Sequence, residues 1–542
     1  MRSRALLVGL LVFSWAWAAC GPKAPPPPKV PPPPPPAQLG EACKSEGAGA
    51  QASCASGLWC ATAGGGSFCA AACPCAAGGV CAASPDVPEM CMKACTSDGD
   101  CKSGLRCNAD WGACAPEGLL AAKAPACSAT ALTRKAFGKV TQVSKAGKAT
   151  HSPAAGLDRN GDLVSVYVSG TGPGSSTLVG FKALVARDDI AAGEADRPLA
   201  IERENASDPW ITRDKNGKLY MAFVGWNGQG QKGSMIGLTS SDDGVTWSKP
   251  VMAHDAATDC PGDAAGCLDS PMVVIGPDRV TQKNDVIYVF YWSNATNSLR
   301  AVHSTDGGQT FSTSAKVGDG GHADADVTSS GIVHVVFSAA GGNKMGDTTN
   351  GVYYTRSMDG GETFAPPVRI SSQNEPVPYH FSTPRVVVDL PRARLYAVYN
   401  AGTPDGKWEI VLSTSKDGGV TWTRESVNDD APCAAHMLPA AALDPSTGKV
   451  HIAWVENRSA GGGGVAYSVC DKAGTSCSKN EAVSEAPFAA FGFGRGSTAS
   501  VGDTIALVVD SRHKLLHALW SQPVDEGGAA TARVFHSAAK LR

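Results

Sequence analysis

The chain has 542 residues, 19 cysteines and a formal net charge of −3, and it is too long for one ordinary domain. Its charges form no basic stripe, so we expect no nucleic-acid partner. After the first 20 residues, no apolar stretch reaches the roughly 18–20 residues that a membrane-spanning helix needs. Composition divides the chain into four unlike parts.

Residues 1–19 resemble a bacterial lipoprotein signal peptide. Arg2 and Arg4 precede an apolar run, and small residues lead into Cys20. The resemblance implies that Cys20 is lipidated; the alternative is ordinary cleavage that leaves Cys20 as a plain thiol. The proline-rich segment 20–39 is then an extended spacer. We expect an exported protein anchored to the bacterial cell envelope, and Gly21 favours the outer membrane or cell surface over the inner membrane.

Residues 40–127 hold 13 of the cysteines, from Cys43 to Cys127. Such density in an exported chain indicates a small disulfide-rich domain, and the absence of histidine from this segment argues against a zinc site. We therefore expect no metal. Two near-copies predict a duplicated small knot whose pairing the sequence leaves open: Cys54-Ala-Ser-Gly-Leu-Trp-Cys60 and Cys101-Lys-Ser-Gly-Leu-Arg-Cys107.

Residues 128–542 contain four copies of the pattern Ser-x-Asp-x-Gly-x-Thr-aromatic, at 240–247, 304–311, 357–364 and 415–422. The pattern is typical of a hairpin turn, because the Ser and Asp side chains bond nearby backbone and glycine tolerates positive φ. It resembles the Asp-box (BNR) repeat of sialidases and related β-propellers, which implies an all-β propeller. The resemblance implies structural roles at the periphery for Asp242, Asp306, Asp359 and Asp417.

Strand-like runs between the boxes give the number of blades. Seven β-rich second strands predict seven four-stranded blades, with six blades and one irregular insertion as the alternative. Those runs are 163–168, 219–224, 286–292, 332–337, 395–399, 450–454 and 515–520. The last unit lacks a fourth strand, and 138–143 looks like one. We expect this N-terminal strand to complete the last blade and close the ring.

Five cysteines belong to the propeller. In the sixth unit Cys470 replaces the box Ser and Cys477 the aromatic residue, so a disulfide is predicted across that turn. Cys260 and Cys267 are expected to staple the loop between the second and third blades. Cys433 is left over, and we hypothesise that it pairs with Cys127.

The first strand of most blades begins at a histidine or aspartate, which makes these positions candidates for ligand binding at one mouth of the channel. A ring of such groups suits a metal, sugar hydroxyls or an acidic ligand. The alternative, which is favoured, is that each side chain bonds the backbone of a neighbouring blade. Two tryptophans at the ends of second strands add stacking surfaces. The candidates are His151, Asp208, Trp226, Asp269, Trp292, His322, Asp324, His380 and His436.

A catalytic sialidase implies a more definite set of residues. That family clamps a carboxylate with three arginines and uses a Tyr–Glu nucleophile pair with an Asp acid/base. The candidates here are Arg385, Arg458 and Arg495 for the clamp, and Tyr379 with Glu375 or Glu456 for the pair. However, Asp196-Arg-Pro-Leu199 lacks the aromatic residue of the family's first arginine motif, and sialidase propellers have six blades.

The function expected from the sequence is therefore non-catalytic recognition of a glycan or another ligand at the cell envelope. The first alternative is an exo-sialidase or related glycoside hydrolase, and the second is a protein-binding scaffold. We expect a monomer that needs no cofactor, with glycans or envelope proteins as partners.

Overall fold

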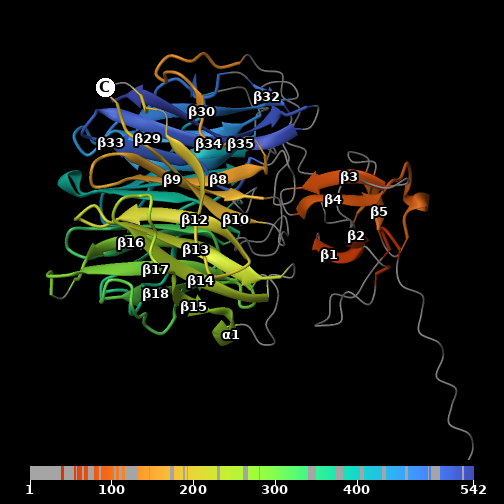
Figure 1. Ribbon diagram of the computed structural model, residues 1–542, viewed down its shortest axis with the longest axis horizontal. Helices are drawn as coiled ribbons and strands as arrows, with labels where there is room; N and C mark the ends of the chain where they lie inside the picture. The colour runs from red at the N-terminus through yellow and green to blue at the C-terminus, as the bar shows by residue number, and fades with distance from the viewer. Residues whose placement is uncertain are drawn as a thin grey trace, which may run out of the picture. The chain divides into compact units, whose positions relative to one another are not determined.

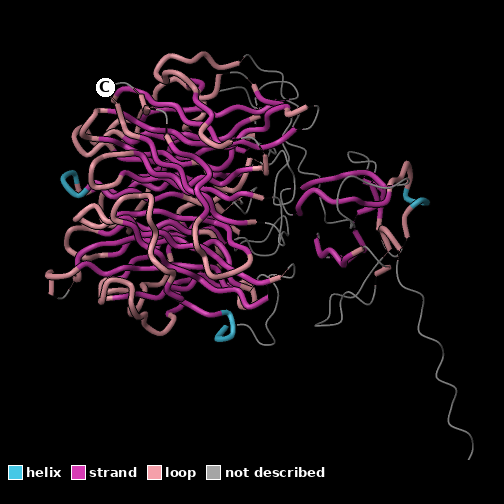
Figure 2. Tube along the Cα trace, in the orientation of Figure 1, coloured by secondary structure: helices cyan, strands magenta, loops and turns pink. Residues whose placement is uncertain are grey.

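The computed structural model describes residues 38–41, 54–55, 58–63, 66–70, 79–84, 87–102, 105–108, 113–115, 131–145, 147–170, 176–186, 189–191, 193–228, 232–259, 267–279, 281–339, 350–373, 375, 377, 382–402, 408–429, 435–457, 462–485, 487–489, 501–527 and 530–541. The chain divides into units 1–36 and 37–542. The predicted signal peptide, Cys20 and nearly all of the spacer lie outside the described residues. What is described consists almost entirely of strands and loops (Figure 2). Among these residues no helix has the length and hydrophobicity to cross a bilayer.

The cysteine-rich segment forms three two-stranded hairpins around a small buried cluster that includes Phe68, Met92 and Leu105. The strands are β1 (Trp59–Ala63), β2 (Gly66–Ala70), β3 (Gly79–Ser84), β4 (Val87–Lys93), β5 (Arg106–Asn108) and β6 (Ala113–Ala115), with a 3-10 turn η2 at Asp98–Asp100. So few apolar side chains make a small core, and disulfides supply the remaining constraint.

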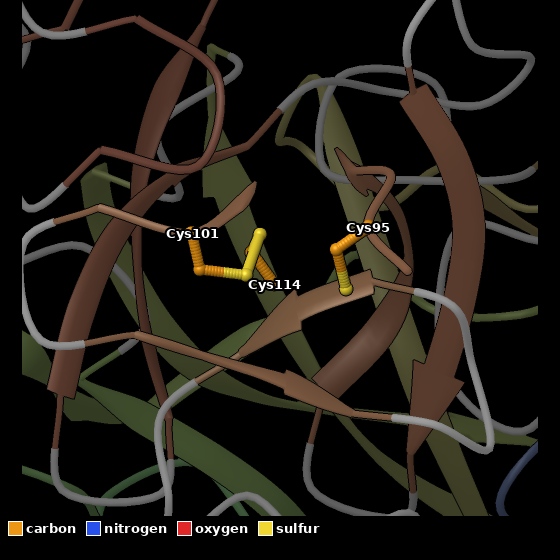
Figure 3. Close-up of side chains that lie close together, drawn as sticks. All are labelled: Cys95, Cys101 and Cys114. Carbon is orange, nitrogen blue, oxygen red and sulfur yellow. A yellow bond between two sulfur atoms is a disulfide. The ribbon is translucent and has the colours of Figure 1, made fainter. Parts of the chain in front are cut away.

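The disulfides follow the duplication seen in the sequence. The first cysteine of each near-copy bonds a later hairpin cysteine, in the pairs Cys54–Cys69 and Cys101–Cys114, and Cys107 pairs back to Cys95. Figure 3 shows Cys95 beside the Cys101–Cys114 bond. The proximity of these sulfur atoms comes from two adjacent disulfides, so the thiolates that a metal would require are not available there.

The propeller has seven antiparallel sheets of four strands each, and the sixth has a short additional strand. In the first six sheets the four strands lie in sequence order, whereas the outer strand of the seventh comes from the N-terminal segment. The first blade consists of β8 (Thr150–Leu157), β9 (Leu163–Ser169), β10 (Thr177–Ala183) and β11 (Glu194–Pro198), and the second of β12 (Asn205–Arg213), β13 (Leu219–Asn227), β14 (Lys232–Ser241) and β15 (Val251–Asp255). The third blade consists of β16 (Leu268–Pro277), β17 (Asp285–Ser293), β18 (Ser298–Ser304) and β19 (Ala315–Asp319). The fourth consists of β20 (Ala323–Val327), β21 (Val333–Ala339), β22 (Gly351–Ser357) and β23 (Val368–Arg369). A short helix, α1 (Ala256–Asp259), follows β15.

The remaining three sheets complete the ring. The fifth blade consists of β24 (Arg385–Asp389), β25 (Arg394–Gly402), β26 (Trp408–Ser415) and β27 (Thr423–Ser426). The sixth consists of β28 (His436–Leu443), β29 (Val450–Glu456), β30 (Gly462–Cys470) and β31 (Glu481–Ala482), and β32 (Phe488–Ala489) also pairs with β30. The seventh consists of β33 (Ala506–Asp510), β34 (Leu515–Asp525), β35 (Ala530–Lys540) and β7 (Thr141–Gln142). A 3-10 turn, η3 (Leu390–Arg392), joins β24 to β25. All seven predicted second strands are confirmed.

The predicted closure is also confirmed, because β7 is the outer strand of the seventh blade. Gln142 and Thr141 pair with Phe535 and His536, and Val143 N donates to Val534 O at 2.9 Å. The innermost strand of each blade contacts that of the next, and β33 contacts β8. In Figure 1 the last blade, in blue, accordingly lies beside the first, in orange. Pairing the chain's two ends removes the open sheet edge that would otherwise remain.

Hydrophobic packing between neighbouring sheets holds the ring together. In the described residues, one buried cluster lies between each pair of successive blades, including the pair formed by the seventh and the first. The second strands alternate their side chains between the two neighbours, so Val168 and Phe223 share one cluster and Phe290 and Phe337 another. Because both faces are buried, the sequences of these strands are near-continuous apolar runs.

Three of the Asp boxes have the predicted geometry. In the third blade, Asp306 Oδ1 accepts hydrogen bonds from the backbone N–H groups of Gln309 and Thr310, and Ser304 Oγ donates to the same oxygen at 2.7 Å. Asp417 repeats this arrangement with the N–H groups of Val420 and Thr421, and Asp359 accepts hydrogen bonds from the Ser357 hydroxyl and the N–H of Thr363. Each box is the turn between the third and fourth strands, at the opposite end of the blade from the start of its first strand.

The prediction for the second blade was wrong by one residue. Asp243, rather than Asp242, accepts the N–H bonds of Val245 and Thr246, and Ser241 rather than Ser240 provides the hydroxyl. The turn is one residue shorter than in the other boxes, because Gly244 follows the aspartate directly. Consecutive Ser and Asp residues allowed two alignments of the pattern, and the hydrogen bonds of the turn follow the second.

Disulfides replace the box in the sixth blade. Cys470 and Cys477 form the predicted bond across the turn, and Gly474 between them has φ +67°. Cys267 is disulfide-bonded, whereas Cys260 lies outside the described residues, as do Cys127 and Cys433.

The apolar run 198–201 resembles an outer strand of the first blade, but most of it follows that strand. β11 is Glu194–Pro198. The following residues Leu199 and Ile201 are buried, and Leu199 N still donates to Leu178 O. Their apolar character reflects packing against the second blade rather than membership of the strand.

Candidate functional site

The beginnings of the innermost strands form one mouth of the central channel. In four blades the residue before a proline there has a left-handed backbone, with φ between 47° and 54°. The pairing register shifts at the same point, which marks a β-bulge. Non-glycine residues rarely adopt positive φ, so the tertiary structure must hold them there. These pairs are Ser152-Pro153, Asp208-Pro209, Ser270-Pro271 and Leu438-Pro439.

Polar side chains from five blades converge on a small cavity at this mouth. Its polar lining consists of Asp208, Ser270, His322, Thr383, Asp503 and Thr504, which belong to blades two, three, four, five and, for the last two, seven. The cavity holds about 30 Å³, enough for a water molecule but not for a larger ligand. A ligand larger than water would therefore contact these side chains from outside the cavity rather than fill it.

Hydrogen bonds fix several of these groups. Ser270 Oγ lies 2.7 Å from His322 Nδ1, and the Trp292 ring lies 5.4 Å from the imidazole. Ser207 Oγ donates to Asp208 Oδ2 at 3.0 Å. The backbone N–H of Asp503 donates to Ser152 Oγ at 3.1 Å. A mouth built this way presents carboxylate, hydroxyl and imidazole groups in fixed positions.

A second cavity, of about 150 Å³, lies further along the channel. Pro209, Trp210 and Thr504 line both cavities, so the two are neighbours. The residues that line the deeper cavity come mostly from the innermost strands, and most have apolar side chains, but backbone and polar groups make up more than half of its exposed surface. Arg385 and Thr504 contribute the polar side chains. The side chain of Arg385 is buried, Nε donates to Pro439 O at 3.0 Å, and the guanidinium lies 4.4 Å from the centre of the Trp210 ring.

Two carboxyl groups of β20 cap the neighbouring innermost strand. Asp324 Oδ2 accepts the N–H of Val386 at 3.0 Å, and Asp326 Oδ2 accepts the N–H of Val388 at 2.8 Å. Burial raises the pKa of Asp324 to about 7, against the opposing effect of Arg385, and raises the pKa of Asp326 to about 6. Asp324 therefore fits the alternative to ligand binding, in which the side chain bonds the backbone of a neighbouring blade.

The other candidate ligand groups occupy different surroundings. Asp208 and His322 lie together at the mouth, with Trp292 beside His322. His151 and Asp269 are buried and bond the serine that follows each. His436 is buried against Trp408 O and Glu456, and Trp226 lies in the cluster between blades two and three. His380 lies outside the described residues.

Of the six candidate catalytic residues, three are described, and no contact joins them in that part of the chain. Arg385 lines the deeper cavity. Glu375 forms an ion pair with Arg424 on the outer strand β27 at 2.8 Å, and Glu456 lies 3.6 Å from His436. Tyr379, Arg458 and Arg495 lie outside the described residues.

Sequence reasoning missed Ser270, Thr383 and Asp503, as well as Trp210 in the channel. A signal was present for three of them. Ser270 and Thr383 stand immediately before a proline that opens an innermost strand, and Trp210 follows such a proline. Asp503 has no proline after it, and only the closed ring brings it to the mouth.

No protein-family model and no curated protein matches this sequence. Among solved structures, the chain is similar to a protein of unknown function from Dyadobacter fermentans (14% identity, 75% of this chain and 99% of that chain, TM-score 0.43). It is also similar to an alpha-L-arabinanase from Penicillium chrysogenum complexed with arabinobiose (15% identity, 75% and 99%, TM-score 0.42) and to a Hadza microbial sialidase (14% identity, 77% and 98%, TM-score 0.40). Similarity at this level concerns the fold and indicates no ligand for this chain.

Proposed function

We propose that this protein recognises a ligand at the channel mouth without converting it, and that the ligand is a glycan. The convergence of Asp208, Ser270, His322, Thr383 and Asp503 carries the proposal. Carboxylate and hydroxyl groups are bidentate and adaptable partners for sugar hydroxyls, and pyrrolidine and indole faces offer apolar contact. Pro209, Pro271 and Trp210 provide those faces in the same cavity wall.

We further propose that lipidation of Cys20 anchors the protein to the cell envelope, at the outer membrane or cell surface. The layout of residues 1–20 and the proline-rich spacer support this part of the proposal. Replacement of the acceptor thiol in Cys20→Ala is expected to move the protein from the membrane fraction to the soluble fraction. Retention of the variant on membranes would refute the anchor.

The absence of turnover is supported by how the described acidic candidates are engaged. Glu375 is paired with Arg424, and Glu456 lies beside His436, so neither carboxylate is placed by these contacts to activate a phenol. The hydrolase alternative predicts that the protein cleaves a fluorogenic sialoside and that Arg385→Ala abolishes cleavage.

A glycan array probed with the full-length protein tests recognition. Asp208→Asn is the most informative variant, because asparagine has the same size and tolerates the left-handed backbone of this position. We expect binding to a restricted set of glycans and at least about tenfold weaker binding by the variant, as for one lost charged hydrogen bond. Val420→Ala, on an Asp-box turn at the opposite end of the blades, is the matched control. Binding that Asp208→Asn leaves unchanged would contradict the proposed site, and absence of any glycan binding would favour the scaffold alternative.

A further inference from the structure

The second half of the cysteine-rich segment holds two disulfides side by side. The bonds are Cys95–Cys107 and Cys101–Cys114, and the sulfur atoms of Cys95, Cys101 and Cys114 all lie within 4.8 Å of one another (Figure 3). Thiol–disulfide exchange begins when a thiolate contacts a disulfide sulfur. Opening the first bond at Cys95 would therefore place a thiolate directly beside the second bond.

The four side chains differ in how well a thiol from solution can reach them. Cys114 and Cys95 are buried, whereas Cys101 and Cys107 are half-buried. Attack from solution on the Cys95–Cys107 bond therefore occurs more readily at Cys107, and it expels Cys95 as the thiolate. Every cysteine whose side chain the structure describes is disulfide-bonded, so the attacking thiol must be an added one.

Hydrogen bonds and strand pairing hold this segment together when a disulfide opens. Asp98 Oδ1 accepts the backbone N–H of Cys107 at 2.8 Å, and Asp100 Oδ2 accepts the N–H of Thr96 at 2.8 Å. In the hairpin of β5 and β6, Cys107 pairs with Cys114. The neighbouring disulfide is thus at an effective concentration far above that of a thiol at about 1 mM in solution.

We infer that these two disulfides exchange partners when a small thiol is present, and so switch between two covalent isomers. The added thiolate attacks Cys107 Sγ, forms a mixed disulfide there and expels the Cys95 thiolate. Cys95 attacks Cys114 Sγ, forms a Cys95–Cys114 bond and expels the Cys101 thiolate. Cys101 then attacks Cys107 Sγ, forms a Cys101–Cys107 bond and returns the small thiolate. Two disulfides exist before and after, so nothing is oxidised or reduced overall and the thiol acts as a catalyst.

The two isomers constrain the chain differently. In the structure, the loops closed by the two bonds, 95–107 and 101–114, overlap along the chain. In the other isomer the loop 101–107 lies inside the loop 95–114. The exchange therefore changes the constraints on this segment without removing a crosslink, which suits a switch that responds to thiols. The inference does not depend on glycan recognition at the channel mouth, and either proposal stands if the other fails.

Peptide mapping of the full-length protein tests the inference without any variant. Trypsin and Asp-N together place the four cysteines on four different peptides, because a lysine, an arginine or an aspartate separates each cysteine from the next. After incubation with about 1 mM glutathione and acid quenching, we expect the linked pairs Cys95–Cys114 and Cys101–Cys107 to appear. The bond Cys54–Cys69, in the first near-copy, should stay intact as the internal reference. Persistence or plain reduction of the original bonds, or equal scrambling of the reference bond, would overturn the inference.

A double variant then tests the route through Cys95. Replacing both Cys95 and Cys107 by serine removes the internal attacking thiolate and leaves the Cys101–Cys114 bond in place. In glutathione that bond should open at least about tenfold more slowly than in the wild type, because only attack from solution remains. The matched control replaces Cys54 and Cys69 by serine, which removes one disulfide elsewhere and should leave the exchange unchanged. Equal opening rates in the first variant and the wild type would refute the route.

Discussion

Closure of the ring by the N-terminal segment can be tested at Phe137. This side chain is 6% exposed, joins the cluster between blades six and seven, and meets the Tyr467 ring edge-on at 5.1 Å. Its backbone neighbours fasten the same segment to β35, since Gly138 N donates to Ala538 O and Val143 N to Val534 O. We predict that Phe137→Ala weakens the seventh blade more than any other.

The magnitude follows from burial and the aromatic contact. Truncation of a buried phenylalanine costs about 3–5 kcal/mol, of which the edge-on pair contributes about 0.5–1.5 kcal/mol. If the segment detaches before the whole domain unfolds, the free energy that protects its amides from hydrogen exchange falls by that amount. Amide hydrogen exchange in Ala530–Lys540 should then accelerate by about two to three and a half orders of magnitude, at about 1.4 kcal/mol for each factor of ten.

Hydrogen-exchange mass spectrometry makes the measurement directly. Peptides from β13 serve as the internal reference, because they belong to the second blade. Lys139→Ala, an exposed change in the same segment, is the matched control and should stay within about 0.5 kcal/mol of wild type. The reasoning fails if exchange in β35 is the same in Phe137→Ala and wild type, or if β13 accelerates equally.

Two further predictions concern the box turns and the channel carboxyls. Both Gly419, with φ +92°, and Gly360, with φ +79°, have a left-handed backbone, but their surroundings differ. A Cβ added at Gly419 would clash with Tyr354 Cε1, whereas a Cβ at Gly360 would enter open space. Gly419→Ala should therefore lower the midpoint of urea unfolding more than Gly360→Ala. Equal midpoints for the two variants would mean that the box glycine does not pack on the preceding blade. Because burial raises the pKa of Asp326 to about 6 and that of Asp324 to about 7, the folded state holds these protons more tightly than the unfolded state does. These two carboxyl groups therefore lower the free energy of unfolding as pH rises from about 4 to 7, by at most about 1.4 kcal/mol per pH unit for each group, whereas the buried histidines His334 and His451, whose pKa burial lowers to about 4, act in the opposite direction. Relative to the wild type, the free energy of unfolding of Asp326→Asn in urea should therefore rise with pH between those values, while that of Asp319→Asn, at an exposed side chain, should follow the wild type. An unchanged slope in Asp326→Asn would contradict the assignment.

Local patterns were sufficient for the architecture because a propeller repeats one unit. Each second strand is apolar on both faces, each box confines a turn within eight residues, and the missing fourth strand has one candidate, at 138–143. The same local reasoning failed at Asp242, where Ser240 and Ser241 permit two alignments, and at β11, where buried residues after the strand resemble the strand itself.

The candidate site depended on tertiary structure to a much greater extent. The sequence singled out Asp208 and His322 as the first residues of innermost strands, but it also singled out His436, which the fold buries against Trp408 and Glu456. Whether such a side chain reaches the channel depends on how the neighbouring blades pack around it, and residue type alone does not encode that packing.

The amino-acid sequence by itself determined that this chain forms a propeller, and it favoured seven blades over six and closure by the N-terminal strand, because that information lies in periodic runs and turns of a few residues. The tertiary structure alone decided that Trp210 covers Arg385, and that Asp503 joins Asp208 at one mouth. These partners are on different blades, and only closure of the ring brings them within contact of one another.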